Sequence, residues 1–120
     1  FYYRHYDDFN RYTLLDEILL EGLAENFREQ VIDKTPALWV SALTQRAAFE
    51  VLDSMDEQVL SSKDPDLIRG ILFGNDKYKR WTGYAVGYWL VKEFIRKKSD
   101  LSWEQIMKLK SQEILEIARK

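Results

Sequence analysis

Two carboxylates lie four residues apart in one of the most apolar segments of the chain, where Glu21 and Glu25 flank Gly22 and Leu23. Positions i and i+4 stack on one face of a helix, so both side chains are expected to point the same way. Glycine costs about 1 kcal/mol relative to alanine in a helix interior, so Gly22 indicates that another backbone comes close. A carboxylate beside such a glycine could reach a metal ion held by a second helix. The alternative is that both glutamates are solvated surface residues.

A second set of polar groups lies in the segment 80–97, where Tyr84 and Tyr88 are four residues apart on the same helix face as Trp81. The favoured interpretation is that these rings belong to the core and that their hydroxyls find partners there. The alternative is catalytic. The Tyr84 hydroxyl, or the guanidinium of Arg80, could donate a hydrogen bond to the oxyanion formed when water attacks a peptide carbonyl.

The nitrogen and sulfur ligands that zinc prefers are scarce in this sequence. It has a single histidine, His5, and no cysteine. A zinc site needs three or four protein ligands, and carboxylates alone suit harder cations. His5 is therefore interpreted as structural or exposed. The 120-residue chain by itself is expected to bind no zinc and to lack activity.

Two long helices are predicted to position these groups. Thr13 can act as the N-cap of a helix over 13–31, with Asp16 completing a carboxylate version of the capping box. Apolar residues recur at three- and four-residue spacing in this segment and again over 80–97, so each helix has a broad buried face. We expect these two helices to contact each other and to form the centre of the core. Gly83 and Gly87 have the spacing that allows close helix packing.

The rest of the chain also reads as helical, with no convincing strand. An all-α compact bundle of about six helices is predicted, forming one domain over residues 1–120. The further helices are expected at about 36–41, with Trp39 anchored in the core; from Thr44 to about Leu60, with Asp56 and Glu57 on its solvated face; from Asp64 to Gly74; from a capping box of Ser102 and Gln105; and from a cap at Ser111 to the end of the chain.

The segment Glu21-Gly22-Leu23-Ala24 resembles the Glu-Gly-(Leu/Phe)-Ala segment with which gluzincin metallopeptidases supply their third zinc ligand, downstream of a His-Glu-x-x-His helix. A wider match covers about residues 13–117. It includes Phe73-Gly74-Asn75 and the string RWTGYAVGY at 80–88, and it resembles the C-terminal half of the YjaZ-like predicted zinc-dependent proteases, a family long catalogued as a domain of unknown function.

This resemblance implies that Glu21 is the third zinc ligand and that Glu25 orients a ligand histidine. The His-Glu-x-x-His element would supply two histidines and the general base, and it would lie just N-terminal to Phe1. Because the sequence lacks that element, the chain is expected to be a helical fragment of a larger gluzincin-like domain, with part of the substrate cleft and an incomplete site. Asp16 is interpreted as a cap.

The composition of the chain argues against nucleic acid and membranes as partners. A net charge of −2 gives no electrostatic case for nucleic acid, and neither an apolar run of about 18 residues nor a signal peptide is present. We expect a cytoplasmic protein that acts on a peptide or protein substrate. The aromatic residues near Phe1 predict self-association, because a short end segment cannot bury them all. The alternative function is a non-enzymatic helical module for protein interaction or regulation.

Overall fold

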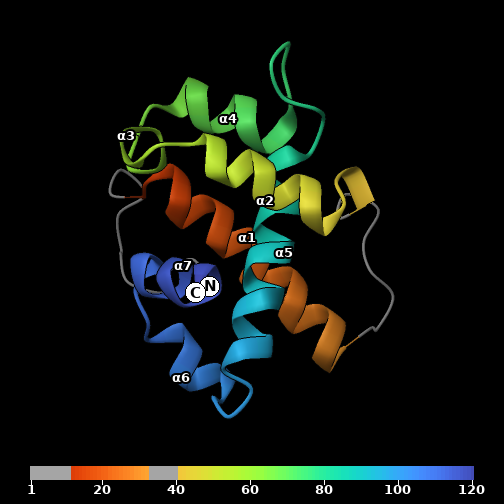
Figure 1. The fold of residues 1–120 in the computed structure, drawn as a ribbon, viewed down its shortest axis with the longest axis vertical. Coiled ribbons are helices and arrows are strands. Elements are labelled where there is room, and N and C mark those ends of the chain that lie inside the picture. Colours follow the sequence, from red (N-terminus) through yellow and green to blue (C-terminus); the bar gives the residue numbers. More distant parts are fainter. Residues whose placement is uncertain (1–11, 33–40) are drawn as a thin grey trace.

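The computed structural model describes residues 12–32 and 41–120, and all of its regular elements in those ranges are helices (Figure 1). The predicted all-α fold is therefore confirmed. Within these ranges no helix is both long and apolar enough to cross a lipid bilayer. The helices are α1 (Leu14–Val31), α2 (Gln45–Ser54), α3 (Glu57–Leu60), α4 (Pro65–Phe73), α5 (Thr82–Lys97), α6 (Trp103–Met107) and α7 (Ser111–Arg119).

Helix α1 begins where its sequence predicts. The Thr13 hydroxyl accepts a hydrogen bond from the backbone N–H of Asp16 at 3.1 Å, and the Asp16 carboxylate accepts one from the backbone N–H of Thr13 at 3.0 Å. This reciprocal capping box satisfies two of the free donors at the helix start. The predicted role of both residues as caps is confirmed.

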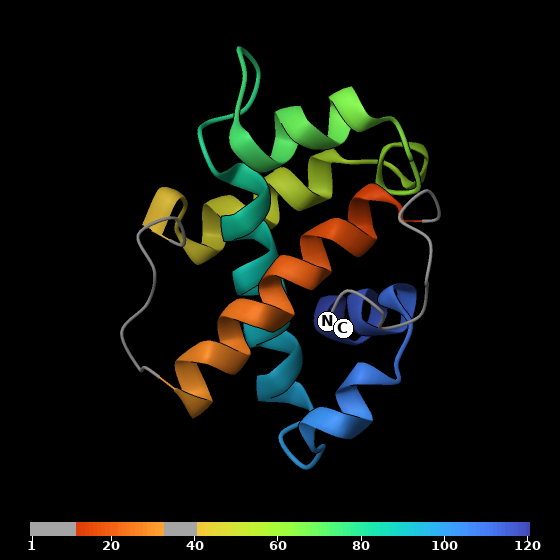
Figure 2. The same ribbon diagram turned by 180° about the vertical axis from the view of Figure 1, so that it is seen from behind.

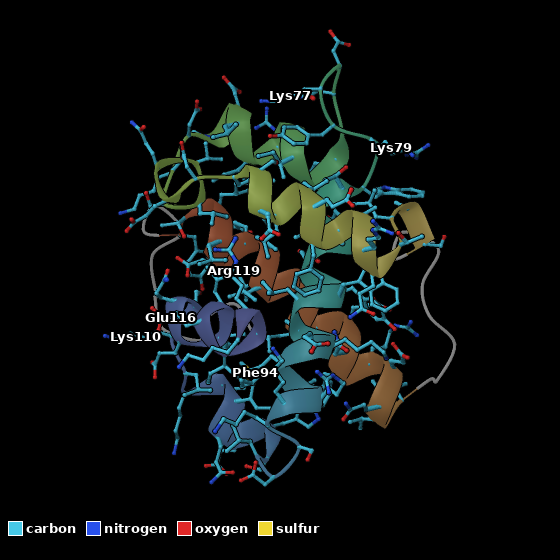
Figure 3. The ribbon with its side chains drawn as sticks, in the orientation of Figure 1. Lys77, Lys79, Phe94, Lys110, Glu116 and Arg119 are labelled. Atoms are coloured by element: carbon cyan, nitrogen blue, oxygen red, sulfur yellow. The ribbon has the colours of Figure 1, made fainter. Side chains whose placement is uncertain are left out.

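Helices α1 and α5 cross at the centre of the molecule and make its most extensive helix contact. Figure 2, which views the fold from behind, shows α1 lying across α5. Helices α2 and α4 lie toward one end of α5, and α6 and α7 lie toward the other (Figure 1). Phe94 of α5, labelled in Figure 3, is fully buried in this core. The predicted contact between the two long helices is confirmed.

The apolar pattern predicts that the second long helix starts at Arg80. Helix α5 instead starts two residues later, at Thr82. Trp81 has a φ of 64° and a ψ of 22°, a left-handed conformation that cannot extend a right-handed helix. The first helical residue is therefore Thr82. Within the part of the chain that the structure describes, no side-chain cap hydrogen bond forms at this end of α5.

The single helix predicted from Thr44 to Leu60 is wrong, because the chain forms α2 and α3 instead. Met55 is extended and buried at the junction. Asp56 then caps α3, its carboxylate accepting a hydrogen bond from the backbone N–H of Val59 at 2.8 Å. The local cap competes with helix continuation for these backbone groups. Asp56 and Glu57 are exposed, as predicted, but Asp56 also has this structural role.

The predicted cap at Ser111 is also wrong. The N-cap of α7 is Lys110, whose backbone N–H donates to the Glu113 carboxylate at 3.0 Å. Ser111 is buried, and its hydroxyl donates to Asp16 of α1, so it joins two helices. By contrast, the caps at Asp64 and Ser102 and the helix end at Gly74 are confirmed. The predicted helix at 36–41 and Trp39 fall mostly outside the described residues.

Candidate functional site

The crossing of α1 and α5 is a direct contact between two backbones. A methyl group added at Gly22 would lie 2.5 Å from the carbonyl carbon of Gly87 and 2.8 Å from a methyl group of Val91. A methyl group at Gly87 would overlap the carbonyl of Ile18. The prediction that Gly22 admits another backbone is thus confirmed. Gly83, in contrast, packs against Leu72 of α4.

The side chain of Asn26 links α1 and α5 at this crossing through hydrogen bonds. It is 2% exposed, and its side-chain amide donates to the carbonyl of Gly22 at 2.8 Å and to the carbonyl of Tyr88 at 3.1 Å. One side chain therefore bridges the two backbones close to Glu25 and Gly22. Sequence reasoning missed this residue, although an asparagine in an otherwise apolar helical stripe was a usable signal, because buried amides need partners.

Glu21 is half-buried on the flank of α1, one helical turn from Glu17 and one from Glu25. Burial raises the pKa of its carboxyl above the usual value, and the charges of Glu17 and Glu25 raise it further. Burial and the neighbouring charge of Asp16 likewise raise the pKa of Glu17. Among the described residues, the Glu21 carboxylate has no hydrogen-bond or ion-pair partner. Such a desolvated carboxylate, repelled by its neighbours, gains the most from a bound cation.

Glu25 lies deeper, 7% exposed, and is already engaged by a cation on its own helix. The guanidinium of Arg28 donates to one Glu25 oxygen through both Nε, at 3.0 Å, and Nη2. Sequence reasoning did not single out Arg28, although the i, i+3 spacing of opposite charges indicates such a pair. The role of Glu25 beside a metal stays a prediction.

Tyr84 and Arg80 lie at the start of α5 in different environments. The half-buried ring of Tyr84 is tilted against Phe73, with ring centres 5.7 Å apart. The exposed guanidinium of Arg80 lies over the Trp81 ring, 4.3 Å from its centre. In the described structure, no hydrogen bond or ion pair links either residue to Glu21. The catalytic role of Tyr84 and Arg80 as hydrogen-bond donors to an oxyanion stays a prediction.

Tyr88 is a buried core residue, as its favoured interpretation predicts. Its ring is 3% exposed and packs edge-on against Trp89. Burial raises the pKa of Tyr88, and the neighbouring carboxylate of Glu29 raises it further, against the opposing effect of Lys92. The Lys92 ammonium is 3.4 Å from Glu29 and 5.2 Å from the Tyr88 ring centre. The ion pair of Lys92 with Glu29 is thus a second polar link between α5 and α1.

The donor set for a metal is incomplete within the ranges that the structure describes. They contain no group of three histidine, cysteine, aspartate or glutamate side chains arranged to hold a metal ion. His5 lies outside them. Glu21 fits a zinc ion as a single carboxylate ligand, by its lack of a partner and its raised pKa, but further ligands have to come from elsewhere.

Comparison with known protein families gives a match over most of the chain. The model of a family described as "Predicted Zn-dependent protease (DUF2268)" matches residues 1–116. No curated protein and no solved structure matches the chain.

Proposed function

The chain belongs to this family of predicted Zn-dependent proteases, and from that premise we propose that it forms part of a zinc-dependent peptidase in which Glu21 is a metal ligand. The finer proposal is that it is a YjaZ-like member, on the resemblance of residues 73–75 and 80–88. The observation that carries the proposal is the state of Glu21: half-buried, without a partner among the described residues, and with a pKa raised by burial and by two neighbouring carboxylates.

We propose that the other protein ligands are two histidines from a His-Glu-x-x-His element that this sequence does not contain. A His2Glu set leaves one coordination position open for water. When bound, zinc would supply a Lewis acid that lowers the pKa of that water. The contribution of this chain is then to hold the Glu21 carboxylate at a fixed place, through the tight packing of Gly22 on Gly87.

Three further side chains have proposed roles around the metal ligand. Glu25, already held by Arg28, would accept a hydrogen bond from the free ring nitrogen of a ligand histidine and fix its orientation. Tyr84 and Arg80 would donate hydrogen bonds to the carbonyl oxygen of a peptide substrate as negative charge develops on it. Tyr84 is half-buried and Arg80 is exposed, so we propose Tyr84 as the main donor of the two.

The test compares the full-length gene product with its Glu21→Ala, Glu25→Ala and Glu17→Ala variants by zinc content and peptidase activity. Glu21→Ala is expected to weaken zinc binding and abolish activity, because it removes a ligand. Glu25→Ala is expected to loosen zinc by roughly 10- to 100-fold, as losses of ligand-orienting groups do. Glu17→Ala is the matched control, since it removes a similar carboxylate one turn away and is expected to keep the zinc.

Equal zinc in the full-length protein and its Glu21→Ala variant would remove Glu21 from the site. The non-enzymatic interaction module would then be the better account of this helical surface. The 120-residue chain tested alone is expected to hold no stoichiometric zinc, because its donor set is incomplete.

A further inference from the structure

The loop between α4 and α5 concentrates positive charge. We call residues 74–81 the cationic loop. It contains Lys77, Lys79 and Arg80, all exposed, against one carboxylate, Asp76, so that three positive charges and one negative leave a net charge of +2. The whole chain has a net charge of −2. The loop projects from one end of the molecule beyond α4 (Figure 1), and Figure 3 shows Lys77 and Lys79 on it.

The cations of this loop are held in place without being neutralised. Arg69 and Arg96, on the flanking helices, form ion pairs with carboxylates of their own helix. No such pair forms at Lys77, Lys79 or Arg80 with any carboxylate in the described ranges. Instead, Arg80 lies 4.3 Å from the centre of the Trp81 ring, and Lys77 lies 5.5 Å from that of Tyr78. Cation–π contacts orient a charge and leave it available to an anion.

Hydrogen bonds among residues 75–78 fix the backbone of the loop. The side-chain oxygen of Asn75 accepts from the backbone N–H groups of Lys77 and Tyr78, both at 2.9 Å. The backbone N–H of Asn75 donates to the carbonyl of Tyr78, also at 2.9 Å. A loop ordered before binding loses less conformational entropy when a partner docks. The cationic loop is therefore a preorganised surface.

An exposed apolar side chain borders this charged surface. Phe73, the last residue of α4, is 51% exposed, and its ring contacts that of Tyr84. Among the described residues, only Val31 and Ile32 are large apolar side chains of comparable exposure, and both lie at the end of α1. The surface thus offers cations and one aromatic contact next to each other.

We propose that the cationic loop docks an acidic segment of polypeptide, whose carboxylates pair with Lys77 and Lys79 and whose apolar side chain contacts Phe73. Three cations are few for a nucleic-acid footprint, and the net charge of −2 repels a long polyanion. Binding to an anionic membrane takes a larger basic cluster, and the turn closed by Asn75 and Tyr78 encloses Asp76 and Lys77, neither of which is an apolar side chain to insert. Arg80, also in this loop, is a proposed donor to a substrate carbonyl, so the docking residues under test are Lys77, Lys79 and Phe73, and their test needs neither zinc nor peptidase activity.

The test measures binding of a short fluorescein-labelled peptide, made of glutamates around a central phenylalanine, to the 120-residue chain. The same peptide with glutamines in place of the glutamates is the ligand control. Lys77→Glu/Lys79→Glu is the test variant, and Lys63→Glu/Lys98→Glu, which reverses two exposed lysines outside the loop, is its matched control. The loop variant is expected to bind about tenfold more weakly than the wild type, with the control variant close to wild type.

Binding of the glutamate peptide is further expected to weaken as salt rises, and Phe73→Ala is expected to weaken it at constant salt. Circular dichroism and thermal unfolding verify that all variants fold. Equal affinity in the loop variant and the control variant would overturn the proposal, as would equal binding of the glutamine peptide. Tighter loop-dependent binding to phosphatidylserine vesicles or to single-stranded DNA would overturn it in favour of that other partner class.

Discussion

Glu21 is the residue on which the proposed chemistry depends, and its surroundings favour a partner that the described chain does not provide. Glu17 and Glu25 lie one turn away on either side of Glu21, and the guanidinium of Arg28 bonds to Glu25. A half-buried carboxyl in a negative field holds its proton to a higher pH than a free one. A metal ion bound at this place would reverse the preference and favour the ionised form of the Glu21 carboxyl.

The raised pKa of Glu21 has a consequence for stability. A carboxyl that binds its proton more tightly in the folded state stabilises the fold at low pH. That contribution is lost as pH rises from about 4.5 through the raised value, since the folded state binds more protons across this window. Glu21→Gln, which stays uncharged, is therefore expected to be more stable than wild type at pH 7 in metal-free protein. Unfolding in urea at pH 4 and pH 7 measures the effect.

The exposed Glu116 on α7 provides the control for that experiment, because Glu116→Gln removes a charge that is not among those that raise the pKa of Glu21. If Glu21→Gln is less stable than wild type at pH 7, or gains no more than Glu116→Gln, the inference from burial and charge repulsion is wrong.

The packing of α1 on α5 is what holds Glu21 in place at the scale of the elements. The two backbones touch at Gly22 and Gly87. Asn26 and the ion pair of Lys92 with Glu29 add polar links between the same two helices. Each link joins the two helices near the segment that carries the proposed ligand. Movement of α1 relative to α5 is therefore opposed by both steric fit and hydrogen bonding.

Gly22→Ala tests this packing, because helix propensity predicts a more stable protein and the tertiary contact predicts a less stable one. Propensity alone would stabilise α1 by about 1 kcal/mol. The added methyl group, 2.5 Å from the Gly87 carbonyl carbon, forces the helices apart and is expected to destabilise the fold by about 1–3 kcal/mol. Thermal or urea unfolding gives the answer. Ala24→Gly, on the flank of the same helix, is the control and should cost only about 1 kcal/mol. An unchanged or raised stability for Gly22→Ala would mean that the contact is looser than the structure shows.

The two long helices could be predicted because periodic apolar positions and capping signals agree along their whole length. Where local chemistry competes with the pattern, the prediction failed. Asp56 caps a new helix inside a continuous apolar stripe, and Ser111 donates its hydroxyl to Asp16 across the fold instead of capping α7. Trp81 takes a left-handed conformation that no propensity of tryptophan indicates. Each of these depends on a tertiary contact or a local hydrogen bond that spacing alone does not encode.

The candidate site shows the same division. Gly22 beside a carboxylate pointed to close packing, and the contact with Gly87 bears this out. The hydrogen-bond partners of the polar groups could not be predicted from residue spacing. Arg28 donates to Glu25 and Asn26 donates to the Tyr88 carbonyl, and both bonds depend on which face each helix buries. The metal-ligand role of Glu21 came from resemblance and not from spacing, and it stays a proposal.

At the scale of the whole molecule, the chain combines a rigid helical core with two surfaces of opposite charge. The acidic row on α1 contains the proposed metal ligand, and the cationic loop at the start of α5 contains the proposed docking surface. Membership in the family of predicted Zn-dependent proteases connects the first of these to metal chemistry. One ligand position on a firmly packed helix is what this chain is proposed to add to the zinc site.

The most direct test of that central claim is a crystal structure of the full-length gene product, with anomalous diffraction recorded on both sides of the zinc absorption edge. The account predicts a zinc peak about 2.0–2.2 Å from a Glu21 carboxylate oxygen, the distance typical of zinc carboxylates, with two histidines as the other protein ligands. A zinc peak whose ligands do not include Glu21, in a protein that retains its activity, would contradict it.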